Sequence, residues 1–358
     1  MISTHEQQTD KGFSIGWITL NLPQTLNALT LDMATAALEQ LRVWAGREDI
    51  VCVVLQGEGR AFCAGGDVRR MRQGILDNDD YCERFFEQEY RLDHTIHRYP
   101  KPLLAWGHGV VMGGGLGLLV GASHRVVTQS TRMAMPEINI GLYPDVGASW
   151  FLNQLPSGLG LFLGITGCEW NSADAIALKL ADYLLDDSAR QQLPSLLTTL
   201  PWGNTAVDNR AVLTQGLQQL PPATVTMQLM HFAQPIAQAC QHSLQQTISA
   251  LRALDIKEPW FIRALDNLAH GNPVTACLVA EQLRRGGNLS LEDALRMEWC
   301  VSIQCCHLPD FPEGVRAQLV DKDKLPRWQF ADIASVPDAY VAGHFALAGR
   351  DNPLVNLA

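Results

Sequence analysis

The stretch GHGVVMGGGLGLLVGASHRV, from Gly107 to Val126, contains three consecutive glycines at positions 113 to 115. If a helix begins at these glycines, its first N–H groups have no partner inside the helix, and the helix dipole favours a negative group beside them. Small residues at this point could equally serve close packing of a helix on a sheet. The spacing does not fit GxGxxG, because Val120 stands where the third glycine would be, so we discount a dinucleotide site.

A second glycine turn precedes this stretch, in GRAFCAGGDVRRM from Gly59 to Met71. Gly65 and Gly66 permit positive φ and leave backbone N–H groups uncovered, and Asp67 can cap a following helix. An ordinary strand-to-helix turn would look the same, since Gly-rich turns are common. Two N–H donors from two such turns that converge on one point would instead form an oxyanion hole.

The segments around these turns alternate between strand-like and helix-like patterns. Residues 31–44 have the spacing of a helix, with Thr30 as its N-cap. Alternating or continuous apolar runs indicate strands at residues 13–20, 50–55, 102–106 and 125–128. Alternation of this kind predicts an α/β fold with right-handed crossovers.

The composition of the chain changes near residue 186. Prolines and glycines interrupt the next segment, and residues 226–300 then have a helical pattern rich in Gln, Leu and Ala. We therefore predict two regions. Residues 1–225 would form an α/β core, and residues 226–358 a helical C-terminal region.

Two carboxylates lie in MPEINIGLYPDVGASWFLNQL, from Met135 to Leu155, a stretch that is otherwise apolar and rich in glycine. Both Glu137 and Asp145 follow a proline. A buried carboxylate needs a partner, or its pKa rises and it keeps its proton. Either outcome suits acid–base or nucleophilic chemistry. Both acids could also cap helices or bind turn amides, and Asp145 in YPDVG fits a Pro-Asp turn.

The 358-residue chain is 47% hydrophobic and has a formal net charge of −10. This acidic balance argues against a nucleic acid or an anionic membrane as partner. The polar start, MISTHEQQTDKGF, resembles neither a secretory signal nor a transit peptide, and the longest apolar run, Gly109–Ala122, is too short to span a bilayer. We therefore expect a cytoplasmic protein.

The nine cysteines are scattered and include no CxxC pair. Cys305 and Cys306 are followed by His307, but no second pair completes a zinc site. We therefore expect reduced thiols, most of them in the core, and no metal.

Three stretches, AFCAGGD, GVVMGGGLGL and MPEINIGLYPDVGASWFL, together resemble the crotonase (enoyl-CoA hydratase/isomerase) superfamily in their order and separation. LEDALRMEWCVSIQC and DFPEGVRAQLVDKDKLPRW are similar to its 3-hydroxyisobutyryl-CoA hydrolase branch, whereas a generic hydratase ends sooner. The resemblance runs from about residue 13 to residue 345. It implies a crotonase-like spiral of repeated ββα units and an acyl-CoA substrate. It implies no separate cofactor, because CoA is part of the substrate. A homo-oligomer would fit it too, since crotonases are often trimers or paired trimers.

The resemblance also implies roles for individual residues. The thioester oxygen would lie between the N–H groups of Gly66, the second glycine of AGGD, and Gly114, the middle glycine of MGGG, which would form the oxyanion hole. The Glu of MPE and the Asp of PDVG would face the thioester, so Glu137 and Asp145 are the expected catalytic residues. Glu89, in EQEYRL, would line the substrate pocket.

Two departures from the hydratase pattern favour hydrolysis over hydration. Hydratases resemble GGGCEL at the second motif, where the Glu handles water; this chain has GGGLGL, with Gly117 at that position. Hydratases have a Gly after the Pro of the third motif, where this chain has Asp145. We therefore expect hydrolysis of a short hydroxyacyl-CoA thioester. The alternatives are an enoyl-CoA hydratase or isomerase and a catalytically silent acyl-CoA-binding protein.

Two aspects of substrate binding stay open. Ala148, Ser149 and Trp150 replace the Gly-rich and aromatic pattern of the branch, which leaves the exact acyl group undecided. The CoA phosphates need positive charge, and the basic residues near the two glycine turns are Arg69, Arg70, Arg72 and Lys101. We assign the role to none of them.

Overall fold

The computed structural model describes residues 1–347 and 349–357, which group into two compact units. Each unit is built from three segments of the chain. The first unit comprises Met1–Gly66, Arg91–Met133 and Trp170–Gln228, and the second comprises Asp67–Tyr90, Ala134–Glu169 and Leu229–Ala358. One boundary, at Gln228, lies close to the division expected at residue 225. The division into a core and a C-terminal region stays a prediction.

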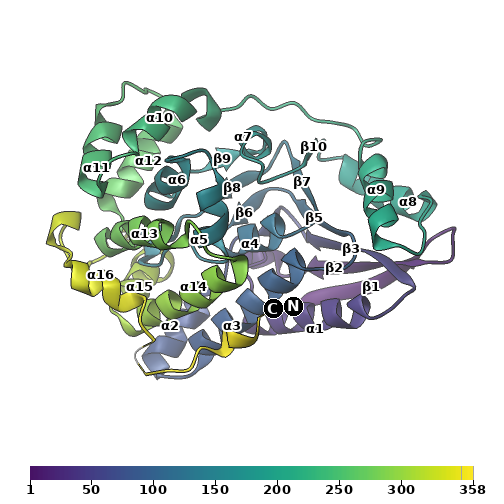
Figure 1. Ribbon diagram of the computed structural model, residues 1–358, viewed down its shortest axis with the longest axis horizontal. Helices are drawn as coiled ribbons and strands as arrows, with labels where there is room; N and C mark the ends of the chain where they lie inside the picture. The colour runs from purple at the N-terminus through teal and green to yellow at the C-terminus, as the bar shows by residue number, and fades with distance from the viewer. Residues whose placement is uncertain (348, 358) are drawn as a thin grey trace. The chain divides into compact units, whose positions relative to one another are not determined.

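The larger of two sheets in the first unit has six strands in the order β1-β2-β3-β5-β7-β10 (Figure 1). All neighbours pair in parallel except β1 and β2, which are antiparallel. This confirms the predicted α/β class. The strands are β1 (Ile2–Gln8), β2 (Ser14–Leu20), β3 (Ile50–Gly57), β5 (Leu103–Gly107), β7 (His124–Thr128) and β10 (Tyr183–Leu185).

The smaller sheet has four strands in the order β4-β6-β8-β9. Three times in succession, one strand joins the larger sheet and the next joins the smaller one: β3 and β4, β5 and β6, then β7 and β8. Helix α2 (Val68–Asp77) follows the first pair and α4 (Gly114–Val120) the second. This repetition confirms the predicted spiral of ββα units. The small-sheet strands are β4 (Ala61–Cys63), β6 (Val110–Met112), β8 (Arg132–Ala134) and β9 (Trp170–Asn171).

One hydrophobic cluster of the first unit packs on the six-stranded sheet. Its parallel strands are buried almost throughout, as continuous apolar runs such as IVCVVL require. Helices α8 (Ala189–Thr199) and α9 (Ala206–Leu217) contribute buried side chains to the same cluster. Trp17 and Trp106 from the strands pack there with Leu193 and Leu213 from the helices.

Most predicted elements of the first unit are present. Helix α1 (Leu31–Ala45) begins where expected, and the Thr30 hydroxyl accepts a hydrogen bond from the Met33 N–H. Strand β1 lay outside the prediction because ISTHEQQ is polar and mostly exposed, as suits an edge strand. The unit also contains α7 (Ser172–Ala177), and α3 (Tyr81–His97) contributes residues to both units.

The second unit is predominantly helical, and the helical pattern predicted for residues 226–300 is confirmed. Besides α2, its helices are α5 (Ala148–Phe151), α6 (Leu159–Thr166), α10 (Ala233–Ala239), α11 (Leu244–Ala253), α12 (Pro259–His270), α13 (Pro273–Gly286), α14 (Leu291–His307), α15 (Asp310–Val315) and α16 (Asp338–His344). Short helical turns include η2 (Glu137–Ile140), η3 (Leu152–Gln154), η4 (Leu229–Phe232), η6 (Ile333–Ser335) and η7 (Pro353–Asn356); η1 (Pro23–Thr25) belongs to the first unit, and Arg316–Val320 forms a π-helix.

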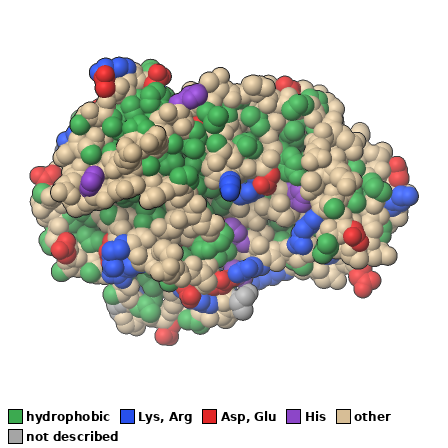
Figure 2. Space-filling model, turned by 45° about the horizontal axis from the view of Figure 1, so that its top comes forward, with side chains coloured by type: hydrophobic (Ala, Val, Ile, Leu, Met, Phe, Trp, Pro, Cys, Tyr) green, Lys and Arg blue, Asp and Glu red, His purple; other side chains and the backbone are tan. Residues whose placement is uncertain are grey.

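Two surface properties follow from the described residues. No helix among them is long and apolar enough to cross a membrane. On the face shown in Figure 2, acidic and basic side chains lie interspersed among uncharged ones.

Candidate active site

The two glycine turns meet in the first unit. Gly65 has a φ of +105°, and a Cβ placed on it would lie 3.7 Å from the backbone nitrogen of Gly114. Gly66 pairs in a parallel bridge with Leu29. Because Gly114 is the first residue of α4, its N–H has no partner within that helix. The structure therefore places the turns that carry Gly66 and Gly114 side by side.

Close packing of a helix on a sheet, the plainer explanation of the glycines, also holds. A Cβ on Gly115 would collide with the Cys63 carbonyl and lie 2.8 Å from the Cys63 Cβ. The end of β4 and the start of α4 thus touch through a position that only glycine fits. The same contact sets the spacing between the two turns.

The three predicted carboxyl groups lie in the second unit. Glu137 is 5% exposed at the start of η2, Asp145 is 4% exposed before α5, and Glu89 is 2% exposed on α3. Neither η2 nor α5 begins with a side-chain cap, so neither Glu137 nor Asp145 serves as an N-cap. Oε2 of Glu137 is buried without a hydrogen-bond partner among the residues described.

The environments of Glu137 and Asp145 differ. Burial and, second, the nearby charge of Asp145 hold the pKa of Glu137 well above its usual range. Burial raises the pKa of Asp145 to about 6, although a hydrogen bond from Tyr90 lowers it in part. The Tyr90 hydroxyl donates to Oδ2 of Asp145 at 2.7 Å. Asp145 therefore has a neutral hydrogen-bond donor beside it, whereas Glu137 has the charge of Asp145 beside it.

The hydrogen bonds continue from Tyr90 to α14. The Tyr90 oxygen lies 2.7 Å from Oγ of Ser302, which lies 3.0 Å from the hydroxyl of Tyr143. Tyr143 in turn donates to the backbone carbonyl of Glu298 at 2.6 Å. All of these groups are buried, so the network links the Asp145 loop to one face of α14.

Residues of α13 and α14 also bind the backbone around Asp145. Thr275 donates to the Leu142 carbonyl at 2.5 Å, and Gln282 donates to the carbonyl of Pro144, the residue before Asp145. The fully buried carboxyl group of Glu298 accepts hydrogen bonds from two backbone N–H groups in the turn that follows Asp145. The C-terminal helices therefore hold the loop that carries Asp145.

Sequence reasoning missed Tyr90, Tyr143, Glu298 and Ser302. Glu298 and Ser302 had a detectable signal. They lie seven and eleven residues after Leu291, in the same helical stripe as Ala294 and Leu295. Polar groups within an apolar stripe need buried partners, and here the partners are the Asp145 loop and two tyrosines.

The basic residues near the glycine turns are engaged within their own units. In the second unit Arg69 donates to the Leu319 carbonyl at 2.9 Å, and Arg72 donates to the Pro312 carbonyl at 3.1 Å. Arg70 pairs with Asp79 at 2.7 Å and stacks on Tyr81. In the first unit the ammonium group of Lys101 binds the carbonyls of Trp44 and Arg47, at the end of α1.

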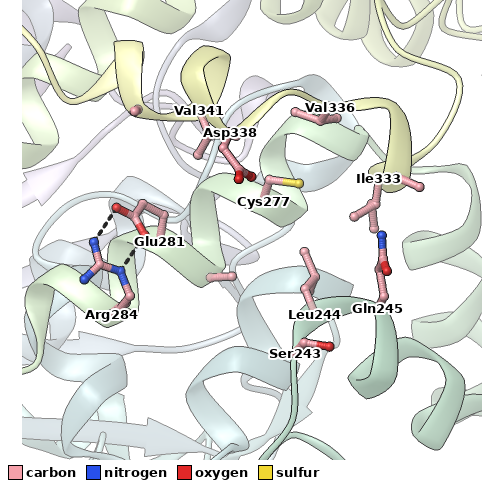
Figure 3. Close-up of a pocket in the computed structure, with 13 residues that line it drawn as sticks. Ser243, Leu244, Gln245, Cys277, Glu281, Arg284, Ile333, Val336, Asp338 and Val341 are labelled. Atoms are coloured by element: carbon pink, nitrogen blue, oxygen red, sulfur yellow. Dashed lines mark hydrogen bonds and ion pairs between the residues drawn. The ribbon is translucent and has the colours of Figure 1, made fainter.

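Two further features of the described residues bear on ligands. No three His, Cys, Asp or Glu side chains among residues 1–347 and 349–357 gather in a way that could hold a metal ion. A cavity of about 640 Å³ in the second unit is lined by α11, α13, α16 and the segment before α16, and its lining includes Leu244, Cys277 and Val341 (Figure 3). None of Glu89, Glu137 and Asp145 lines it.

Comparison with known proteins places the chain in a family. The family model described as "Enoyl-CoA hydratase/isomerase" matches residues 15–345. The chain belongs to the enoyl-CoA hydratase/isomerase family. Among curated family relatives, the mitochondrial 3-hydroxyisobutyryl-CoA hydrolase of Danio rerio is 34% identical over 91% of this chain and 85% of its own length. The Homo sapiens protein of the same name is 31% identical over 98% of this chain and 91% of its own.

Two solved structures share the fold over almost the whole chain. A carnitinyl-CoA dehydratase from Mycobacterium thermoresistibile superimposes with a TM-score of 0.87 at 33% identity, covering 99% of both chains. An enoyl-CoA hydratase from Rhodobacter sphaeroides 2.4.1 gives 0.83 at 32% identity, covering 97% of this chain and 98% of its own. The similarity confirms the crotonase-like fold with its helical C-terminal region.

Proposed function

We propose that this protein hydrolyses 3-hydroxyisobutyryl-CoA to the free hydroxy acid and CoA. The observation that carries the proposal is the buried pair of Glu137 and Asp145, with Gly117 on α4 where a hydratase has its second Glu. The names of the curated relatives, similar over nearly the whole chain, support the same thioester hydrolysis.

The proposed reaction adds water to the thioester carbonyl and breaks its C–S bond. Charge develops on the carbonyl oxygen in the transition state, and the N–H groups of Gly66 and Gly114 would stabilise it. One such donor is typically worth about 3–4 kcal/mol. The contact between the two glycine turns supports this assignment, because two donors must be close together to bind one oxygen.

Glu137 would supply the base or the nucleophile. In one route it takes a proton from the attacking water, and the leaving CoA thiolate is protonated in return. In the other route its carboxylate attacks the carbonyl and expels CoA thiolate, which is protonated, and water then cleaves the resulting anhydride to release the hydroxy acid and regenerate Glu137. Both routes need a carboxyl group whose basicity is raised and which has an oxygen that accepts no hydrogen bond. Glu137 has these properties among the described residues.

Asp145 and Glu89 would recognise the hydroxyacyl group. Asp145 would bind the 3-hydroxyl of the substrate or position the water, and Glu89 would help to bind the same hydroxyl. A site that pairs a substrate hydroxyl discriminates against analogues without it, because its own polar groups would be left unpaired. We therefore propose a preference for 3-hydroxyisobutyryl-CoA over isobutyryl-CoA.

The first experiment is thiol release from 3-hydroxyisobutyryl-CoA, with isobutyryl-CoA and crotonyl-CoA alongside. Fast release from the hydroxyacyl ester, without loss of the crotonyl double bond, supports the hydrolase. Loss of that double bond without thiol release would support the alternative, an enoyl-CoA hydratase or isomerase, which the names of the two solved structures make worth testing. Binding of CoA esters without either reaction would support a silent acyl-CoA-binding protein.

The proposal extends to cofactors, partners and place of action. The reaction needs carboxylates and water only, so dialysis against EDTA should leave the rate unchanged. We place the reaction in valine degradation, from the proposed substrate. The cytoplasmic location stays a prediction for fractionation to test, since the curated relatives carry "mitochondrial" in their names. The homo-oligomer also stays a prediction, for light scattering to test.

A further inference from the structure

The backbone directly after Asp145 adopts an unusual conformation. Val146 has a φ of +54° and Gly147 a φ of +88°. Positive φ is uncommon for any residue with a side chain, and for a β-branched one it is a true outlier. Such conformations persist only where the surroundings hold them. The direction of the Asp145 side chain therefore depends on whatever fixes this turn.

Glu298 on α14 is the group that binds the turn. Its Oε2 accepts the N–H of Gly147 at 2.7 Å, and its Oε1 accepts the N–H of Ser149 at 2.7 Å. The Glu298 side chain is completely buried. Burying a carboxyl group is costly without compensating hydrogen bonds, and this one uses both oxygens on two backbone groups of a single turn.

The turn that Glu298 binds is also packed closely against two helices. The Cβ that Gly147 lacks would lie 3.2 Å from Leu291, at the start of α14. A Cβ on Gly286, at the end of α13, would lie within 3.1 Å of the Ser149 carbonyl carbon. The turn is thus enclosed by two helices, and Glu298 pairs the two N–H groups that it presents to α14.

We infer that Glu298 is a positioning residue for Asp145, acting by fixing the turn at Val146 and Gly147. It does not touch the substrate. The inference rests on the proposed function, since it gives Asp145 a part in the hydrolysis. It predicts that loss of the Glu298 hydrogen bonds lowers the rate only while Asp145 contributes to catalysis.

A double-mutant cycle tests this. Glu298→Gln keeps the side-chain shape but replaces one acceptor oxygen with an NH₂ group that faces an N–H donor. We expect it to lower kcat about 10- to 100-fold, as small displacements of catalytic groups do. In the background of Asp145→Asn, the same Glu298→Gln change should lower kcat less than about twofold, because Asp145 no longer contributes.

Glu281→Gln is the matched control. Glu281 lies on α13 and pairs with Arg284 and Arg285 at 2.6 Å, beside the cavity shown in Figure 3. The substitution makes the same chemical change without touching the Asp145 loop, and we expect kcat to stay within twofold.

A second readout does not depend on activity. Amide hydrogen exchange at Gly147 and Ser149 should accelerate at least tenfold in Glu298→Gln and stay unchanged in Glu281→Gln. If the wild-type protein releases no thiol, the proposed function fails, and exchange alone decides whether Glu298 holds the turn.

Three results would overturn the inference: unchanged exchange in Glu298→Gln, unchanged kcat in an active wild-type background, or an equal loss of kcat in both backgrounds. The last would mean that Glu298 supports the fold in general. Should Glu298→Gln fail to fold, Glu298→Asp, which keeps the carboxylate but is one methylene shorter, is measured in the same cycle with the same criteria.

Discussion

The Tyr90 hydroxyl donates a 2.7 Å hydrogen bond to Oδ2 of Asp145, while Oε2 of Glu137 has no partner among the described residues. This hydrogen bond makes the environments of the two buried carboxyl groups different. It stabilises the charged form of Asp145, whereas burial and the charge of Asp145 favour the protonated form of Glu137. Two carboxyl groups whose environments push their pKa values apart can take different roles in one reaction.

Tyr90→Phe should move the acidic limb of the pH–rate profile to higher pH. The Tyr90 hydrogen bond lowers the pKa of Asp145, so its removal raises that pKa, and the carboxylate is lost at a higher pH. A hydrogen bond to a charged group is worth about 1.5–3 kcal/mol, which corresponds to a movement of about one pH unit or more. The measurement is kcat/KM for 3-hydroxyisobutyryl-CoA between pH 5 and 8.

Ser302→Ala is the control for Tyr90→Phe. Ser302 bonds to Tyr90 and Tyr143 but makes no hydrogen bond to Asp145, so its loss should move the limb much less. Equal movement in both variants, or none in Tyr90→Phe, contradicts the role assigned to the Tyr90 hydroxyl.

Glu137→Gln should stop turnover but keep CoA-ester binding. An amide has the shape of the carboxyl group but can neither accept a proton from water nor attack the carbonyl. We expect kcat to fall about 10²- to 10⁴-fold, the usual contribution of a general acid–base residue. Thiol release gives kcat, and calorimetry with a CoA ester gives the binding constant. Retained turnover would reduce Glu137 to a structural residue.

The same substitution should stabilise the protein, and more so at alkaline pH. The pKa of Glu137 is raised in the folded state. Above the pKa of about 4.5 in the unfolded chain, the unfolded state therefore loses its proton more readily, and stability falls as pH rises towards the folded-state pKa. Glu137→Gln removes this loss. The loss that it removes amounts to about 1.4 kcal/mol for each unit by which the pH exceeds the unfolded-state pKa, until the folded-state pKa is reached.

The measurement is Tm of wild type and Glu137→Gln at pH 5 and pH 8, with a larger gain expected at pH 8. In Glu281→Gln the change in stability has the opposite sign, since hydrogen bonds from Arg284 and Arg285 lower the pKa of Glu281 to about 2. That variant should lose stability equally at both pH values. A gain for Glu137→Gln that does not grow with pH would contradict the raised pKa.

Gly115→Ala should damage both stability and catalysis. The new Cβ would meet the Cys63 carbonyl and force α4 away from the end of β4. Overpacking of this kind costs about 1–3 kcal/mol. Since the same contact spaces the turns of Gly66 and Gly114, kcat should fall about 10- to 100-fold, as when an oxyanion donor is displaced. Urea unfolding and thiol release measure the two effects.

Gly343→Ala provides the comparison. Gly343 lies in α16, and a Cβ there would meet nothing within 4 Å. Because alanine favours helix more than glycine, this variant should gain about 0.5–1 kcal/mol and keep full activity. An unchanged kcat in Gly115→Ala would show that this glycine contact does not position the oxyanion hole.

Local signals predicted much of the fold. Thr30 caps α1 and Asp67 caps α2 as expected, because a cap depends only on the residues of the next turn. The apolar run at residues 50–55 became the buried strand β3. Strand β1 escaped prediction, since ISTHEQQ has no apolar pattern and forms only by pairing with β2.

The candidate site was only partly predictable. Glu137 and Asp145 stand out because an apolar segment seldom contains acids. Their partners could not be found the same way: Tyr90 precedes Asp145 by 55 residues, and Ser302 is 212 residues beyond Tyr90. Only tertiary packing brings them together. Glu298 in the apolar stripe of α14 indicates a buried acceptor, but not which backbone it binds.

The reduced cysteines have a practical consequence. The nine cysteines form no disulfide among the residues that the structure describes, and all but Cys277 are buried. Burial raises the pKa of Cys240 to about 12 and that of Cys277 to about 11, so little thiolate is present near neutral pH. A dye that reacts with thiolates should therefore detect released CoA over a low background. Without substrate, slow labelling would report how often the chain opens, and the folded protein would act as its own unfolding sensor.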